Sequence, residues 1–179
     1  DHADFLERVD LLGAAEREMG RDAKIVVSNY IEFHRLAGYL FRHTRAPVGV
    51  VLGGPTVREI FEEGWYENLE GGLLEACGRL FQNGLRMYVY PCRDPEHGVV
   101  TAETFRPETH LVKLYEFLCD NGAIRSLAEP EGEFLDIFSR EALAKIRSGD
   151  DEWEAMVPPP VAEMIRARGL LGCLTVRGN

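Results

Sequence analysis

The sequence predicts an α/β fold: a three-layer, Rossmann-like domain in which helices cover both faces of a short, mainly parallel sheet. The main indication is the stretch 24–54, in which two apolar, β-branched segments, 24–29 and 47–54, flank a segment with helical apolar spacing. Neither outer segment alternates polar and apolar residues, which is typical of strands covered on both faces. A strand, a helix and a second strand in this order form a βαβ unit with parallel strands and a right-handed crossover.

The other elements follow from hydrophobic periodicity and from the residues that start and stop helices. Thr56, with Glu59 three residues later, forms a capping box for a short helix after the second strand. The stretch 92–107 contains two turn signals and is predicted to be an irregular loop. We expect helices over 4–19, 30–41, 56–63, 73–82, 107–119, 139–147 and 161–168, and strands over 24–29, 47–54, 85–90 and 123–127.

Composition limits the class of protein. With 179 residues and 45% hydrophobic content, the chain suits a single α/β domain over residues 1–179. A net charge of −10 argues against a general nucleic-acid binder, and no apolar run is long enough to cross a membrane. The four cysteines form no CxxC pair, so we expect reduced thiols and a cytoplasmic location. Because the chain opens at Asp1 within a helical pattern, we expect it to be the C-terminal domain of a longer protein, whose N-terminal domain is a partner.

The predicted sheet brings one group of polar and glycine residues to a single edge. In an open parallel sheet, ligands bind beyond the carboxyl ends of the strands. Polar side chains follow the first predicted strand, glycines allow close backbone approach after the second, and helix N-termini point amides at the same edge. These residues predict binding of a phosphorylated metabolite or a nucleotide; the alternative is that they are helix caps and turn residues. The candidate ligand-binding residues are Ser28, Asn29, Gly53, Gly54, Thr56 and Arg58.

Three residues are candidates for acid–base chemistry: His34 on the helix after Ser28, Glu70 beside two glycines, and His110 in the first turn of its helix. Each also has a structural interpretation, since histidines often take part in packing and paired glycines let helices approach closely. No histidine pair at helical spacing adjoins a carboxylate, so no metal site is expected, and the cofactor is left open. The GxGxxG, GxxxxGK[ST] and GxSxG motifs are absent from the sequence. If the domain is catalytic, nucleotidyl or phosphoryl transfer is the expected class.

Four long runs of sequence carry a resemblance to a known family. Over nearly its whole length, the chain resembles the C-terminal portion of a bacterial family of uncharacterised proteins, whose members are labelled nicotinate-nucleotide adenylyltransferase or TonB-dependent receptor. The first label implies an HxGH motif after the first strand and an ISxTxxR motif near the end, and this sequence has neither. The second implies an outer-membrane receptor, which the acidic, helix-rich pattern does not match. The runs are VSNYIEFHRLAGYLFRHT, GPTVREIFEEGWYENLEGGLLEACGRLFQNGLRMYVYP, FSREALAKIRSGD and WEAMVPPPVAEMIRARGL.

Two further hypotheses stay open. The segment 25–29 resembles the strand of haloacid-dehalogenase-type phosphohydrolases that ends in a phosphate-binding Ser or Thr, although the nucleophilic DxD is missing. The other hypothesis is a non-catalytic structural or oligomerisation domain that docks on the N-terminal domain or on a second copy of the chain. Its basis is an aromatic content larger than one small sheet needs, at Tyr30, Phe33, Tyr39, Phe41, Trp65 and Tyr66.

Overall fold

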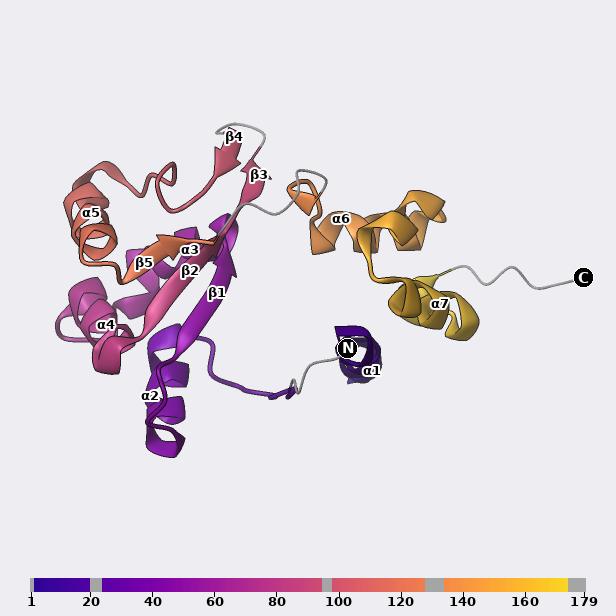
Figure 1. The fold of residues 1–179 in the computed structure, drawn as a ribbon, viewed down its shortest axis with the longest axis horizontal. Helices are drawn as coiled ribbons and strands as arrows, with labels where there is room; N and C mark the ends of the chain where they lie inside the picture. Colours follow the sequence, from indigo (N-terminus) through magenta and orange to yellow (C-terminus); the bar gives the residue numbers. More distant parts are fainter. Residues whose placement is uncertain (1, 20–23, 95–97, 128–133, 174–179) are drawn as a thin grey trace, which may run out of the picture. The chain divides into compact units, whose positions relative to one another are not determined.

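The chain groups into two compact units (Figure 1). The first, termed the α/β unit, comprises residues 28–136, and the second, termed the helical unit, combines 1–27 with 137–179. The expectation of a single domain over the whole chain stays a prediction. The computed structural model describes residues 2–19, 24–94, 98–127 and 134–173.

Three parallel strands form the sheet of the α/β unit, in the order β1-β2-β5. An antiparallel hairpin of β3 and β4 follows β2, within the stretch 92–107 that was predicted to be an irregular loop, so that prediction is wrong there. The mixed α/β architecture and its parallel sheet are confirmed. The strands are β1 Gly49–Gly53, β2 Arg86–Tyr90, β3 Cys92–Asp94, β4 Gly98–Val100 and β5 Ile124–Ser126.

Helices connect the parallel strands: α3 and α4 lie between β1 and β2 in the chain, and α5 lies between β2 and β5. The helix α2, which was expected to begin at Tyr30, begins at Phe33 and precedes β1. The helical segments of the α/β unit are α2 Phe33–His43, α3 Gly54–Ile60, η1 Glu63–Tyr66, α4 Gly72–Leu80, η2 Gln82–Gly84, η3 Thr109–Leu111 and α5 Val112–Asp120.

The segment before α2 is not a strand. Residues 24–32 form neither strand nor helix, so the predicted strand over 24–29 is wrong. Ile25, Val26 and Val27 are 39%, 68% and 63% exposed. β-Branched residues favour a strand only where they can pair with a neighbouring strand and pack on a covered face. Within the described chain β1 pairs with β2 alone, so residues 24–29 have no such neighbour. The parallel connections are therefore those from β1 to β2 and from β2 to β5.

The two faces of the sheet differ in burial. Met87, Val89 and Ile124 point to one face and are at most 1% exposed. On the other face, Val51 is 56% exposed and Arg125 is exposed. The core thus lies against one face, and the coverage of both faces that we expected does not hold at Val51.

Three buried aromatic rings join α3, the loop after β4 and α5. The ring of Tyr115 lies 5.3 Å from that of Phe61 and 5.1 Å from that of Phe105, between centroids. Its hydroxyl donates a hydrogen bond of 2.8 Å to the carbonyl oxygen of Ala102, and burial raises the pKa of this phenol. The ring cluster and this bond hold the loop after β4 against α5.

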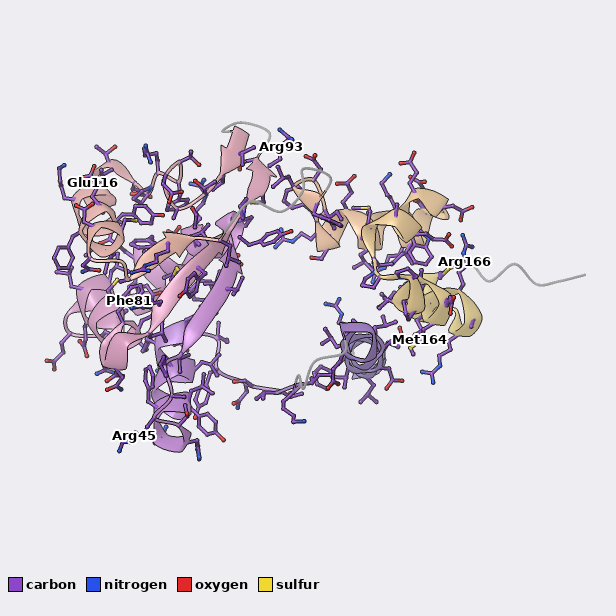
Figure 2. All side chains as sticks on the ribbon, viewed as in Figure 1. Arg45, Phe81, Arg93, Glu116, Met164 and Arg166 are labelled. Carbon is purple, nitrogen blue, oxygen red and sulfur yellow. The ribbon has the colours of Figure 1, made fainter. Side chains whose placement is uncertain are left out.

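The helical unit has a core of its own. Trp153 is 1% exposed and shares this core with Ile146 and Ile165. Arg166, labelled in Figure 2, lies over the Trp153 ring at 5.6 Å from its centroid and donates to Asp151 at 2.6 Å. The segments of this unit are α1 His2–Met19, α6 Ser139–Ser148, η5 Asp151–Met156, α7 Pro159–Arg168 and η6 Leu170–Gly172.

Candidate functional site

Ser28 and Asn29 lie in the segment that leads into α2, and the described residues before them, 24–27, form no strand. The Ser28 hydroxyl oxygen accepts a hydrogen bond of 3.0 Å from the backbone N–H of Tyr30, a local turn contact. The premise that selected these two residues, a position at the end of a strand, is therefore wrong. Their role in ligand binding stays a prediction.

Gly53 and Gly54 do end a strand, as expected, and Gly54 opens α3. A Cβ atom on Gly54 would lie 2.8 Å from Cγ1 of Val100 and 3.2 Å from Sγ of Cys92, which is too close for a real contact. The backbone at this glycine is therefore approached by the β3–β4 hairpin. Beside Gly54, the space is filled by the side chains of Val100 and Cys92, whereas a Cβ atom on Gly53 would meet only Pro55, at 3.8 Å.

The predicted capping box on the next helix is also wrong. α3 begins two residues before Thr56, with Gly53 at the N-cap position and Pro55 in the first turn, so Thr56 lies inside the helix. The guanidinium of Arg58, one turn further, lies 5.5 Å from the centroid of the Phe105 ring. Arg58 is exposed and adjoins the loop after β4.

A polar network that sequence reasoning missed occupies the carboxyl end of β5. Ser126 donates to the Glu103 carboxylate and accepts a bond of 2.9 Å from the Ala102 backbone N–H. The Thr101 hydroxyl donates to the same carboxylate at 2.8 Å. These bonds, that from Ser126 first, hold the pKa of the Glu103 carboxyl below its usual value. A carboxylate at this edge disfavours a phosphate there.

Two of the three acid–base candidates, His110 and Glu70, lie on the surface. His110 Nε2 is 2.6 Å from the Glu63 carboxylate, and both side chains are more than half exposed. Glu70 is exposed as well. The glycines beside it serve the start of α4: Gly72 has a φ of +52°, and the Gly71 N–H donates to the Glu75 carboxylate at 2.9 Å. The glycine pair thus serves the start of the helix. A Cβ atom on Gly72 would meet nothing within 4 Å and one on Gly71 would meet only Glu75, so the expected close approach of a neighbouring helix is not seen there.

Helices α2 and α4 lie next to each other (Figure 1). Residues of both helices line an open cavity of about 460 Å³. Helix α2 contributes residues four apart, which share one helix face, and α4 contributes an arginine one turn before the asparagine–glycine stop. None of the described lining residues is acidic. The lining residues are Tyr30, His34, Arg35, Gly38, Arg42, Arg79 and Gln82.

His34 is the buried polar residue of this cavity. Its side chain is 5% exposed, and among the described residues neither ring nitrogen has a hydrogen-bond partner. The ring lies 5.9 Å from the ring of Tyr66, between centroids. Burial lowers the pKa of the imidazole, so it is uncharged at neutral pH. A buried imidazole with two unsatisfied nitrogens costs free energy unless a further group reaches it.

The arginines around His34 are only partly neutralised. Arg79 Nη2 is 2.5 Å from a Glu75 carboxylate oxygen, and Arg35 Nε is 3.5 Å from that of Glu32. Arg42 donates to a carbonyl of its own helix and lies over the ring of Tyr39. Because the guanidinium has five donors, a single carboxylate leaves several of them for a ligand.

A second cavity, of about 540 Å³, lies between α4 and α5 near the starts of β2 and β5. Its lining includes the apolar side chains of Leu74, Phe81 and Phe117 and the thiol of Cys77. Burial raises the pKa of that thiol to about 11, so it is protonated and unreactive at neutral pH. This cavity offers no arrangement for acid–base or nucleophilic chemistry.

Comparison with protein-family models, with curated proteins and with solved structures found no match. Among the described residues, no cluster of His, Cys, Asp and Glu is arranged to hold a metal ion, and the four cysteines are free thiols. No described helix combines the length and the apolar content needed to cross a membrane.

Proposed function

We propose that the α/β unit binds a phosphorylated metabolite or a nucleotide, with the phosphate group in the α2–α4 cavity. The observation that carries this proposal is His34, a buried imidazole without a partner in a cavity that three arginines line. In a chain of net charge −10, a local cluster of cations without a lining acid favours an anionic ligand.

The guanidinium groups suit a phosphate ligand by their geometry. Arginine presents a planar fork of donors that matches two phosphate oxygens at once. Arg79 approaches from α4, whereas Arg35 and Arg42 approach from α2, so donors reach the cavity from two helices. We propose in addition that the fold is of the three-layer, Rossmann-like type. The ligand then binds between the helices α2 and α4 and not at the edge of the sheet.

The sheet edge that the sequence selected is the second location for the same ligand class. The two locations differ in the arginine that they require: Arg79 for the α2–α4 cavity and Arg58 for the sheet edge. The filled space at Gly54 and the carboxylate of Glu103 favour the cavity.

A thermal-shift screen with inorganic phosphate, nucleotides and sugar phosphates tests the proposal. A ligand at a hundred times its dissociation constant stabilises the folded state by about 2.7 kcal/mol, which raises the melting temperature by a few degrees. We expect Arg79→Gln to abolish this shift and Arg58→Gln to leave it unchanged. Arg140→Gln, an exposed change on α6 in the helical unit, is the matched control. The reverse result for the first two variants would place the phosphate at the sheet edge, and no shift with any probe would contradict phosphate binding.

The open edge of β1 favours self-association as a second candidate function. β1 is a terminal strand of the sheet, and among the described residues its outer edge has no strand partner. Val51 in its middle is 56% exposed. An unpaired edge with an apolar side chain is a template for the same strand of a second copy, paired across a two-fold axis.

Light scattering during size-exclusion chromatography measures the mass in solution. We expect the wild-type chain to form dimers at high concentration and Val51→Lys to be monomeric, because a lysine blocks edge pairing. A wild-type chain that stays monomeric at all concentrations would contradict self-association.

A further inference from the structure

We propose that a dianionic phosphate monoester entering the α2–α4 cavity is bound together with one proton, which is taken up from solvent by His34. This inference rests on the proposed function and adds the charge state of the site to it. His34 is then the residue that makes the site select for two negative charges on the ligand.

The surroundings of His34 within the chain keep the imidazole uncharged. Only 5% of His34 is accessible to solvent, and no described group accepts a hydrogen bond from either ring nitrogen. Burial is the largest influence on its pKa and lowers it. The nearby cations Arg35 and Arg79 act in the same direction.

The carboxylates near His34 act against these cations and are already engaged. Glu32 and Glu75 raise the pKa of the imidazole, Glu32 more than Glu75. Glu32 pairs with Arg35, and Glu75 pairs with Arg79 and accepts from the Gly71 N–H. Their charges are thus shared with other partners, and neither supplies the acceptor that a protonated imidazole needs.

The remaining charged and titratable neighbours come from α2 itself, from η1 and from the segment before α2. Arg42 lines the cavity and disfavours a second cation beside it, as Arg35 does. Tyr66 of η1, whose ring lies next to His34, donates its hydroxyl proton to the Ile60 carbonyl at 2.8 Å. Burial raises the pKa of Tyr66 to about 12, so this phenol stays neutral. Tyr30, which precedes α2 and also lines the cavity, is exposed.

A bound dianion reverses this balance. It brings two negative charges to three guanidinium groups and the imidazole, and an opposite charge at hydrogen-bond distance favours the protonated form of histidine. A protonated ring nitrogen then donates to a phosphate oxygen, and one of the two unsatisfied nitrogens gains a partner. The step breaks no covalent bond of the ligand: one proton moves from solvent to His34.

This coupling predicts the pH dependence of affinity. The free imidazole has a pKa below its ordinary value, and the bound imidazole has a higher one. Between these two values, the affinity for a dianion falls by up to tenfold for each unit by which the pH rises. Above the higher value, the affinity no longer depends on this residue.

Isothermal titration calorimetry with sulfate tests the inference on the full chain, because sulfate stays dianionic across the range and its own protonation does not contribute. Titrations at pH 7 in buffers of different ionisation enthalpy give the number of protons bound per sulfate. We expect a net uptake of up to one proton, an affinity that falls as the pH rises from 6 to 8, and no uptake in His34→Gln. Sulfate binding without proton uptake would overturn the role of His34 and leave the proposed function standing. Absence of both sulfate and inorganic phosphate binding would overturn the proposed function itself.

A spectroscopic readout keeps the test valid if His34→Gln fails to fold. The Cε1–H resonance of each histidine in the wild-type chain reports its own titration by nuclear magnetic resonance. We expect saturating sulfate to raise the pKa of His34 by at least one unit and to leave His43 and His110, which are exposed, nearly unchanged. Equal shifts at all three histidines would indicate an adventitious ion only and would overturn the inference.

Discussion

Gly54 is held against the β3–β4 hairpin so closely that a methyl group would not fit. A Cβ atom there would lie 2.8 Å from Val100. We expect Gly54→Ala to lower the free energy of unfolding by about 1–3 kcal/mol, the usual cost of overpacking. Urea denaturation followed by circular dichroism measures it.

Gly78→Ala on α4 is the matched control, because nothing lies within 4 Å of a Cβ atom there. In a helix interior this change stabilises by about 0.5–1 kcal/mol. If Gly54→Ala left stability unchanged and weakened ligand binding, the sheet-edge site would regain support over the packing explanation.

Glu103 gives the carboxyl end of the sheet a pH dependence. Its pKa is lowered in the folded state, mainly by the bond from Ser126. The stabilisation is therefore present above the ordinary pKa of Glu, near 4.3, and is lost as the pH falls through the lower folded value. Because the side chain is exposed, we expect less than about 1 kcal/mol. Urea unfolding of wild type and Glu103→Gln between pH 3 and pH 6 measures it.

The difference between wild type and Glu103→Gln should shrink as the pH falls below about 4. A constant difference across this range would show that the hydroxyl contacts, rather than the charge, provide the stabilisation.

At this scale the sequence identified His34 and left its environment unknown. The spacing placed His34 on this helix, one turn inside, whereas it is the second residue of α2, which begins at Phe33. Arg79 lies 45 positions away and joins it only through the packing of α2 on α4. Ser126 and Glu103 likewise come from separate segments, and no local pattern links them. Contacts between distant segments depend on tertiary packing, which periodicity does not encode.

At the scale of elements, the position at which α3 begins decides whether Thr56 caps the helix or lies inside it. A capping box would make Thr56→Ala cost about 1 kcal/mol. Since the helix already begins at Gly54, we expect a change within about 0.5 kcal/mol. Thermal or urea unfolding measures the difference.

Asp150→Ala is the positive control for that experiment. The Asp150 side chain accepts a bond of 3.0 Å from the Glu152 N–H at the start of η5 and one of 2.9 Å from Lys145, so its removal should lower stability measurably. An equal loss in Thr56→Ala would indicate that the threonine is a cap after all.

Helices were predicted better than strands because their signal is local. The apolar stripes that predicted α1, α6 and α7 lie within each helix, and the structure confirms all three. A strand needs a partner: residues 24–29 carry strand-favouring side chains, and no strand of the described chain pairs with them. In contrast, β3 and β4 are only three residues long and carry no clear strand pattern, and they form strands because they pair with each other.

At the scale of the whole molecule, Trp153 anchors the helical unit. It is 1% exposed, and truncating a buried tryptophan costs about 3–5 kcal/mol. We expect Trp153→Ala to reduce amide hydrogen-exchange protection in α6 and α7, measured by mass spectrometry. Trp65→Ala is the control, because this residue is 51% exposed and should change protection little. Equal protection in the two variants would contradict a core role for Trp153.

The same pair of tryptophans gives the chain an optical label in each unit. They are the chain's two tryptophans, with Trp65 in the α/β unit and Trp153 in the helical unit. The exposed indole should emit at long wavelength and be quenched by iodide, and the buried one should emit in the blue and resist quenching. Native fluorescence can therefore follow the two units separately in one sample, without a dye or an added reporter.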